Sequence, residues 1–110
     1  MFTERESCFL CDGGLGRLAT VSQDGQPHVV PVAYEFDGHY LYFTGRNLSG
    51  TLKYRHILKN QKVAFVVDDI ASLSPWRARG MEIRGVAEIL IEEGRPYVRI
   101  TPLSKFSWGL

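Results

Sequence analysis

The chain has 110 residues, 45% of them hydrophobic and 12% aromatic, and its formal net charge is +1. This composition predicts one compact domain, residues 1–110, and excludes a disordered chain. The basic residues are scattered, which argues against nucleic acid as the main partner. No apolar run approaches the ~20 residues of a membrane span, and the charged N-terminus is not that of a signal peptide. We therefore expect no membrane partner and a cytoplasmic location.

The first predicted element is a short helix that carries both cysteines of the chain. Thr3 and Glu6 form a capping box, which predicts a helix start near Thr3, and Gly13-Gly14 predicts its end. Cys8 and Cys11 have the Cys-x-x-Cys spacing of a redox pair or of half a zinc site. A zinc site needs two more ligands, and no second cysteine pair exists. We favour two small hydrophobic residues in an amphipathic helix and predict no metal site.

Two Asp-Gly pairs, Asp24-Gly25 and Asp37-Gly38, predict two tight hairpins between residues 16 and 45. We assume a two-residue loop at each turn. The first hairpin then places Thr20 opposite Val29. The second hairpin, by the same reasoning, places residue 32 opposite residue 43.

Because side chains alternate along a strand, these registers separate two faces. The predicted core face carries Ala19, Val21, Val30, Val32, Tyr34, Leu41 and Phe43. The other face carries Leu18, Thr20, Val29, Pro31, Ala33, Tyr42 and Thr44. This second face is too apolar to be left in water, so we expect a subunit, a ligand or both to cover it. Pro31 in mid-strand indicates an edge strand or a bulge.

The rest of the chain predicts one more helix and three more strands. Ser49 is the expected N-cap of a helix that ends near Leu58. We predict a buried strand at 61–69, a loop at 71–80, and strands at 81–91 and 96–108. Six antiparallel strands with one or two short helices predict an all-β fold, a small closed or split barrel.

The clearest candidate site is the anion site at residues 49–53. Ser49, Thr51 and Lys53 supply two hydroxyls and a cation around the free N–H groups of a helix start. The stretch lacks the Gly-x-x-x-x-Gly-Lys pattern, which excludes nucleotide hydrolysis. The alternative is an ordinary capped surface helix with a solvated lysine.

No side chain is predicted to be catalytic, so a bound cofactor is the expected carrier of chemistry. No nucleophile motif occurs, and each histidine is interpreted as a partly exposed surface residue. Asp68 and Asp69 are neighbours on a strand and point to opposite faces, so they do not form one site. Trp76 and Trp108 are candidates either for walls around a planar ligand or for core and subunit contacts.

Four stretches in a fixed order carry a resemblance to a known family. They are Leu15–Val21 with Asp24-Gly25, Leu52–Arg55 continuing into Val63–Asp69, Pro75–Glu88, and Arg99–Pro102 with Ser107–Gly109. The chain resembles the flavin/deazaflavin oxidoreductases of the pyridoxamine-5′-phosphate-oxidase-like split-barrel superfamily. It is most similar to the deazaflavin (coenzyme F420)-dependent group that includes a tetracycline-pathway reductase. Leu90–Tyr97 is shorter than this group leads us to expect, which trims a wall of the pocket.

The resemblance implies a six-stranded antiparallel split β-barrel, similar to FMN-binding proteins, and a homodimer with cofactor sites at the subunit interface. It places the cofactor phosphate near Lys53 and the ring system along Pro31-Val32 and Phe43-Thr44, with the two tryptophans closing the site. The implied cofactor-binding residues are His28, Val30, Pro31, Val32, Phe43, Thr44, Gly45, Ser49, Thr51, Lys53, Trp76 and Trp108.

The expected function is an F420-dependent oxidoreductase that transfers a hydride from the reduced deazaflavin to an unsaturated small organic substrate. The protein positions the ring and the cofactor supplies the chemistry. Three alternatives stay open: an FMN-dependent oxidoreductase on the same fold, a cofactor-binding or carrier protein without turnover, and single-strand nucleic-acid binding. The net charge of +1 disfavours the last of these.

Overall fold

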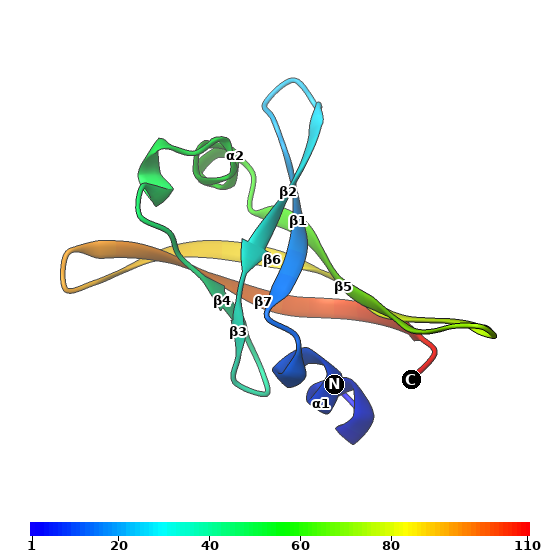
Figure 1. Ribbon diagram of the computed structural model, residues 1–110. Coiled ribbons are helices and arrows are strands. Elements are labelled where there is room, and N and C mark those ends of the chain that lie inside the picture. The colour runs from blue at the N-terminus through cyan, green and yellow to red at the C-terminus, as the bar shows by residue number, and fades with distance from the viewer.

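The computed structural model describes residues 1–110, which form a strongly curled sheet with two α-helices (Figure 1). The elements are α1 (Glu4–Asp12), β1 (Leu15–Val21), β2 (Pro27–Ala33), β3 (Glu35–Phe36), β4 (Leu41–Phe43), the 3₁₀ turn η1 (Leu48–Gly50), α2 (Leu52–Lys59), β5 (Lys62–Leu73), β6 (Trp76–Glu92) and β7 (Arg95–Trp108). None of the helices has the length and apolar character needed to cross a membrane.

All strand pairs are antiparallel, and the sheet order is β2-β1-β5-β6-β7-β4-β3. The all-β split-barrel prediction is confirmed, with seven strands in place of six. The additional strand arises at Tyr34, where the extended chain leaves β1 as its partner and continues as β3 beside β4. β2 and β3 therefore lie at opposite ends of the sheet order although they are joined in sequence. The sheet curls but does not close by strand pairing.

The core is one cluster of 17 buried hydrophobic residues inside the curl. The predicted core positions between residues 30 and 43 are confirmed for Val32, Tyr34, Leu41 and Phe43, which are buried, and Val30 is partly buried against the core. The prediction for β1 is wrong. Leu18 and Thr20, expected on the other face, are fully buried, and Ala19 and Val21 are only partly so.

The error in β1 comes from the length of the first loop. Ser22 N–H donates to the carbonyl of Gln26, and Gly25 alone takes a positive φ of 89°, so the loop has three residues in place of two. Thr20 is consequently opposite His28 in place of Val29. A shift of one residue moves every side chain of a strand to the other face.

The second predicted register is also wrong. The turn centres on Gly38 and His39 because Asp37 N–H donates to the carbonyl of Tyr40. Phe36 then pairs with Leu41. Residues 32 and 43 do not pair, because β2 and β4 are not neighbours in the sheet.

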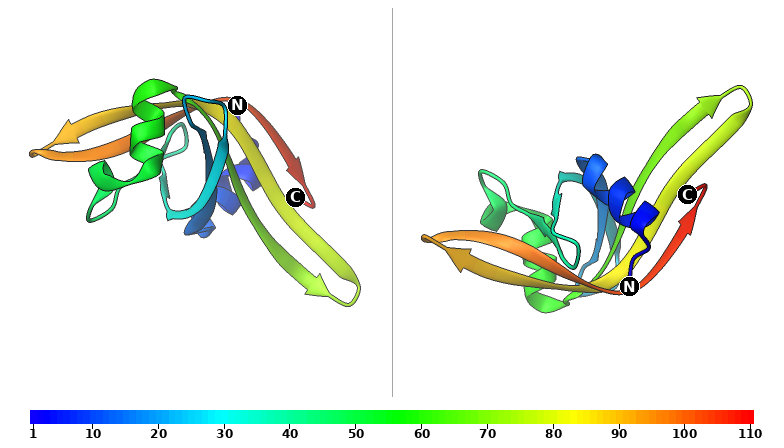
Figure 2. Two further views of the ribbon diagram at one scale, coloured as in Figure 1. Left: turned by 90° about the horizontal axis from the view of Figure 1, so that it is seen from above. Right: turned by 90° about the horizontal axis from the view of Figure 1, so that it is seen from below.

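Two long hairpin arms extend from the body in different directions (Figure 2). One arm is β5–β6 and the other is β6–β7. The predicted loop at 71–80 is wrong, because the strands of the first arm stay paired out to Leu73 and Trp76, with one register shift between Ile70 and Ser72. The turn at Ser74-Pro75 is the only break. The predicted strand at 96–108 is confirmed as β7.

Both predicted helices are present, with one boundary changed. The capping box of α1 forms as expected: Thr3 Oγ1 accepts from Glu6 N–H and Glu6 Oε1 accepts from Thr3 N–H. The N-cap of α2 is Thr51 in place of Ser49. The reason is that residues 48–50 form η1, which places Ser49 inside a separate 3₁₀ turn.

Candidate cofactor site

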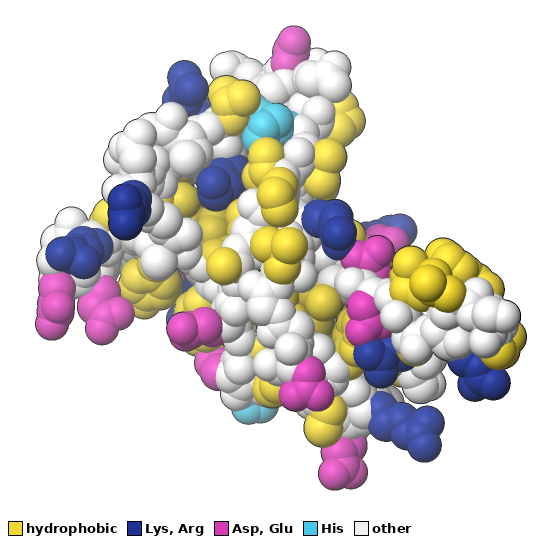
Figure 3. All heavy atoms as spheres, in the orientation of Figure 1, with side chains coloured by type: hydrophobic (Ala, Val, Ile, Leu, Met, Phe, Trp, Pro, Cys, Tyr) yellow, Lys and Arg dark blue, Asp and Glu magenta, His cyan; other side chains and the backbone are white.

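The segment from Arg46 to Lys62 is the most basic part of the chain. It contains Arg46, Lys53, Arg55, Lys59 and Lys62, and no acidic residue occurs between Asp37 and Asp68. None of these five cations makes an ion pair. Figure 3 shows Lys and Arg side chains over η1 and α2. Arg46, Lys53 and Arg55 lie near the start of α2, whereas Lys59 and Lys62 lie at its other end. The first three favour an anionic ligand at the helix start.

The start of α2 has identifiable free donors. The Thr51 hydroxyl donates to the carbonyl of Leu48 over 2.6 Å, so its proton is already used. The N–H groups of Leu52 and Lys53 lie in the first turn and have no partner within the helix. Lys53 is half-buried and the Ser49 side chain is exposed. The predicted phosphate residues therefore lie together, with Thr51 acting through the helix cap.

β2 presents a free main-chain edge beside this segment. The hydrogen bonds Ser22 N–H to Gln26 O and Tyr34 N–H to Gly14 O set which residues of β2 face β1. Because alternate residues of an antiparallel strand point their main-chain groups in opposite directions, those of Val29, Pro31 and Ala33 face outward. Because proline has no N–H, Pro31 fits this unpaired outer side of the strand. β2 is the first strand in the sheet order, which confirms the predicted edge strand. Figure 3 shows hydrophobic side chains along this strand.

His28 joins the free edge of β2 to α2. Its ring meets the ring of His56 edge-on at 5.4 Å between centroids, and His56 Nδ1 lies 2.8 Å from the buried Thr20 hydroxyl. The Nδ1 atom of His28 is buried and has no hydrogen-bond partner. Both histidines are partly exposed, as predicted, but sequence reasoning did not anticipate their contact with each other. They fix the body of α2 against the β1–β2 hairpin.

The other end of the β2 edge opens into a cleft of about 710 Å³, which we call the aromatic cleft. It lies between β4, the β2–β3 junction and the tip of the β6–β7 arm. Its lining residues are Ala33, Tyr34, Glu35, Tyr42, Phe43, Thr44, Glu92, Glu93, Arg95, Pro96 and Tyr97. The segment that the sequence marked as short, residues 90–97, thus supplies one wall.

The chemistry of the aromatic cleft differs from that of the basic segment. The rings of Tyr42 and Tyr97 lie 6.3 Å apart between centroids, and the Thr44 hydroxyl donates to the carbonyl of Pro96 over 3.0 Å. Its three glutamates and Arg95 make no ion pairs. An anionic group is therefore better placed at α2, and a planar conjugated group at the cleft.

Most of the predicted cofactor residues lie along two segments that both connect α2 with the aromatic cleft. These segments are β2, and the link from β4 to η1. Pro31, Thr44 and Gly45 are exposed on them, and Val30 is partly buried. Val32 and Phe43 are buried in the core, so only their main chain can meet a ligand on this surface.

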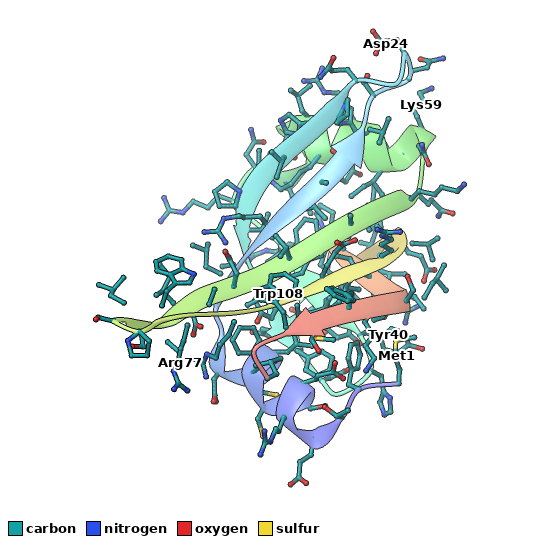
Figure 4. All side chains as sticks on the ribbon, turned by 90° about the vertical axis from the view of Figure 1, so that its right-hand side faces the viewer. Met1, Asp24, Tyr40, Lys59, Arg77 and Trp108 are labelled. Carbon is teal, nitrogen blue, oxygen red and sulfur yellow. The ribbon has the colours of Figure 1, made fainter.

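The two tryptophans lie elsewhere in the chain. Trp76 is 64% exposed at the tip of the β5–β6 arm, beside Arg77, which Figure 4 labels at that tip. Trp108 packs beside Phe106, with 6.1 Å between ring centroids, and covers Gly80 so closely that a Cβ there would overlap its ring. Neither lines the aromatic cleft.

Sequence reasoning did not assign the glutamates and tyrosines of the aromatic cleft to the site. The only available signal was the placement of Tyr42 on the half-apolar face. The two adjacent aspartates behave as expected: Asp68 pairs with Arg17 of β1, and Asp69 pairs with Arg79 of β6. The arginine hydrogen bonds hold the pKa of Asp69 below its ordinary value. Neither carboxylate reaches the cleft.

Comparison with known proteins identifies the family. The family model for pyridoxamine 5′-phosphate oxidase matches residues 2–105. The chain belongs to the pyridoxamine 5′-phosphate oxidase family. A 5a,11a-dehydrotetracycline/5a,11a-dehydrooxytetracycline reductase from Streptomyces rimosus subsp. rimosus is 40% identical over 119 residues, covering 99% of this chain and 84% of that protein.

Solved structures agree with this assignment. A structure described as an F420 reductase superposes with a TM-score of 0.78 at 27% identity, covering 96% of this chain and 98% of that one. The conserved hypothetical protein Rv2991 from Mycobacterium tuberculosis has the same fold, with a TM-score of 0.83 at 23% identity over 99% of this chain and 86% of that one. The Streptomyces reductase and the F420 reductase structure together support an oxidoreductase of the flavin and deazaflavin class.

Proposed function

We propose that this protein is an F420-dependent reductase that transfers a hydride from the reduced deazaflavin to an unsaturated small organic substrate. The observation that carries the proposal is the division of charge along the β2 edge: an unpaired basic segment at α2 and an aromatic cleft at the other end. A phosphorylated planar cofactor would bind with its phosphate at the basic segment and its ring along the β2 edge, which leaves the aromatic cleft beside the ring for a substrate. The likeness to a dehydrotetracycline reductase supports a reductase, and the likeness to an F420 reductase supports the choice of deazaflavin.

The chain's own residues would hold and orient the cofactor. Lys53 and the free N–H groups at the start of α2 would bind the phosphate. The outward main-chain groups of Val29, Pro31 and Ala33 would meet the edge of the ring, whose polar atoms need hydrogen-bond partners when water is displaced. The bound deazaflavin would supply the hydride.

The aromatic cleft would take the substrate. Tyr42 and Tyr97 offer ring faces to a planar conjugated molecule. Excluding water around the reacting carbon is the protein's second contribution. The buried hydroxyl among the lining side chains, that of Tyr34, already donates to the carbonyl of Leu10, so we assign no proton donor to the cleft.

We further propose a homodimer with the site at the subunit interface. Several large hydrophobic side chains are exposed on the β5–β6 arm and on β7, which exceeds what a small monomer ordinarily leaves in water. They are Ile70, Leu73, Trp76, Leu103 and Phe106. A second subunit on this surface would also bring a tryptophan toward the cofactor, as the family resemblance implies. Sedimentation equilibrium tests it: a single species of twice the chain mass is expected, and a monomer at micromolar concentration would exclude it.

The phosphate assignment is tested with Lys53→Ala and a matched control, Lys59→Ala. Both lysines lie on α2 and neither has an ion pair, but Lys59 is at the opposite end of the helix. A hydrogen bond to a charged group contributes about 1.5–3 kcal/mol, so Lys53→Ala should weaken F420 binding about tenfold or more. Lys59→Ala should leave the dissociation constant within about twofold, because an exposed charge at that distance is screened. Equal effects of the two substitutions would refute the phosphate position.

The same fold with FMN is the second candidate, because the basic segment and the β2 edge suit either phosphorylated ring. Recombinant protein that carries a yellow, flavin-like chromophore through purification would favour FMN. A protein that binds the reduced cofactor tightly but oxidises it with no tested acceptor would be a carrier.

A further inference from the structure

The two cysteines of α1 are not part of the proposed cofactor site, and both are exposed free thiols. Their interpretation as small hydrophobic residues is wrong, because α1 turns Glu6, Phe9 and Leu10 inward instead. Cys8 and Cys11 are three residues apart on one helix. They therefore lie on the same side of it and are open to reagents in solution.

Helix geometry places this pair within reach of a disulfide. Residues three apart in an α-helix have Cα atoms about 5 Å apart, inside the range of about 4.4–6.8 Å that disulfides take. Their Cβ atoms, however, start about 5–6 Å apart and must approach to about 4 Å. Closing the bond between Cys8 and Cys11 must therefore tighten the last turn of α1.

That last turn holds a side chain of the aromatic cleft. The Tyr34 hydroxyl donates to the carbonyl of Leu10, between the two cysteines, over 2.6 Å. The turn ends where Gly13 N–H donates to the carbonyl of Phe9 over 3.1 Å. Gly13 also packs closely against the Tyr34 hydroxyl, since a Cβ at Gly13 would lie only 2.5 Å from it. Movement of the turn must therefore move Tyr34.

We propose that Cys8 and Cys11 are a thiol modification site that closes to a reversible disulfide and thereby displaces Tyr34 in the aromatic cleft. Cys8 is the first to react, since it lines a cavity of about 750 Å³ and Cys11 does not. The charged residues that line the same cavity are Glu4, Arg5, Asp12, Asp68, Asp69 and Arg79. Asp68 and Asp69 are already paired with arginines, so Arg5 is the cation left to meet a carboxylate of an incoming reagent, and Glu4 and Asp12 can meet its ammonium group. The reagent class is a low-molecular-weight disulfide such as oxidised glutathione.

The chemistry proceeds by two exchange steps. The Cys8 thiolate attacks one sulfur of oxidised glutathione, forming a mixed disulfide and releasing one glutathione thiolate. The Cys11 thiolate then attacks the Cys8 sulfur and releases the second glutathione. The two cysteines lose two electrons and two protons, and glutathione disulfide gains them.

The test treats the full chain with oxidised glutathione and follows it by mass spectrometry. The wild type should lose two hydrogen atoms and two titratable thiols, and a reductant should reverse both changes. Cys11→Ser should stop at the glutathione adduct on Cys8, whereas Cys8→Ser should react more slowly. Adducts on both cysteines of the wild type without closure, or adducts at equal rates in both single variants, would overturn the proposal.

The coupling to the cleft has its own readout. In the NMR spectrum of the apo-protein, the ring signal of Tyr34 is the tyrosine signal that disappears in Tyr34→Phe. Oxidation should shift this signal in the wild type and leave it unchanged in Cys8→Ser; an unchanged wild-type signal would refute the coupling. Oxidation should also weaken F420 binding about fivefold or more, because Tyr34 directly follows Ala33, whose main chain is proposed to meet the cofactor ring. Only that last readout rests on the proposed function, so a protein that binds no cofactor still tests the disulfide.

Discussion

Tyr34→Phe should destabilise the protein through one buried hydrogen bond. Tyr34 is 8% exposed and its hydroxyl donates to the carbonyl of the fully buried Leu10. Phenylalanine keeps the edge-on contact with Phe65, whose ring centroid lies 5.2 Å away, so ring packing is retained. The loss is the hydrogen bond and the desolvation of an unpaired carbonyl, about 1–3 kcal/mol. The midpoint of thermal unfolding should fall by about 4 °C or more.

Tyr42→Phe is the matched control, because it removes the same atom from an exposed hydrogen bond. The Tyr42 hydroxyl donates to Asp37 Oδ2 over 2.8 Å at the surface, where water replaces the lost partner. We expect a change within about 0.5 kcal/mol. Urea unfolding followed by tryptophan fluorescence measures both, with an unchanged dependence on urea concentration. Equal destabilisation in the two variants would show that α1 is not held to the β2–β3 junction in this way.

Three further outcomes are expected. Lowering the pH from about 5 to about 2 should reduce the free energy of unfolding less in Glu6→Gln than in the wild type. Burial raises the pKa of Glu6, but hydrogen bonds from Lys105, the Thr3 N–H and Ser107 outweigh it and hold the pKa at about 2. Stability is therefore lost as the carboxylate protonates below its ordinary range. Parallel pH profiles of the two proteins would contradict this. Gly16→Ala should lower the free energy of unfolding in urea by about 1–3 kcal/mol, because its Cβ would overlap the Phe65 ring. The control is Gly14→Ala, whose Cβ faces open space. Equal losses in the two variants would refute the packing at Gly16. Pro31→Ala should change stability by less than about 1 kcal/mol, because its nitrogen faces away from β1; a larger loss would place this position inside the sheet.

Local patterns in the sequence were sufficient for elements defined by nearby residues. The capping box of Thr3 and Glu6 involves residues three apart, and α1 begins where it predicts. Registers were not predictable, because Asp24-Gly25 is compatible with loops of two or three residues. The choice depends on how Leu18 and Thr20 fit the core. The paired arm at 71–80 was also missed. Its sequence resembles a loop, and only pairing between β5 and β6 makes it extended.

The candidate site was predicted in part for similar reasons. The anion end could be found because Ser49, Thr51 and Lys53 are close in sequence. The aromatic cleft could not, because Tyr42 and Tyr97 come together only when β7 pairs with β4. The role of His28 against His56 was also hidden, since it depends on where α2 packs.

Fluorescence titration of the purified apo-protein with F420, and separately with FMN, tests the central claim most directly. We predict tight binding of F420 with much weaker binding of FMN, and a loss of F420 affinity in Lys53→Ala but not in Lys59→Ala. Tight binding of FMN with weak binding of F420 would contradict the deazaflavin assignment. Binding of neither would leave the split barrel without the cofactor function proposed for it.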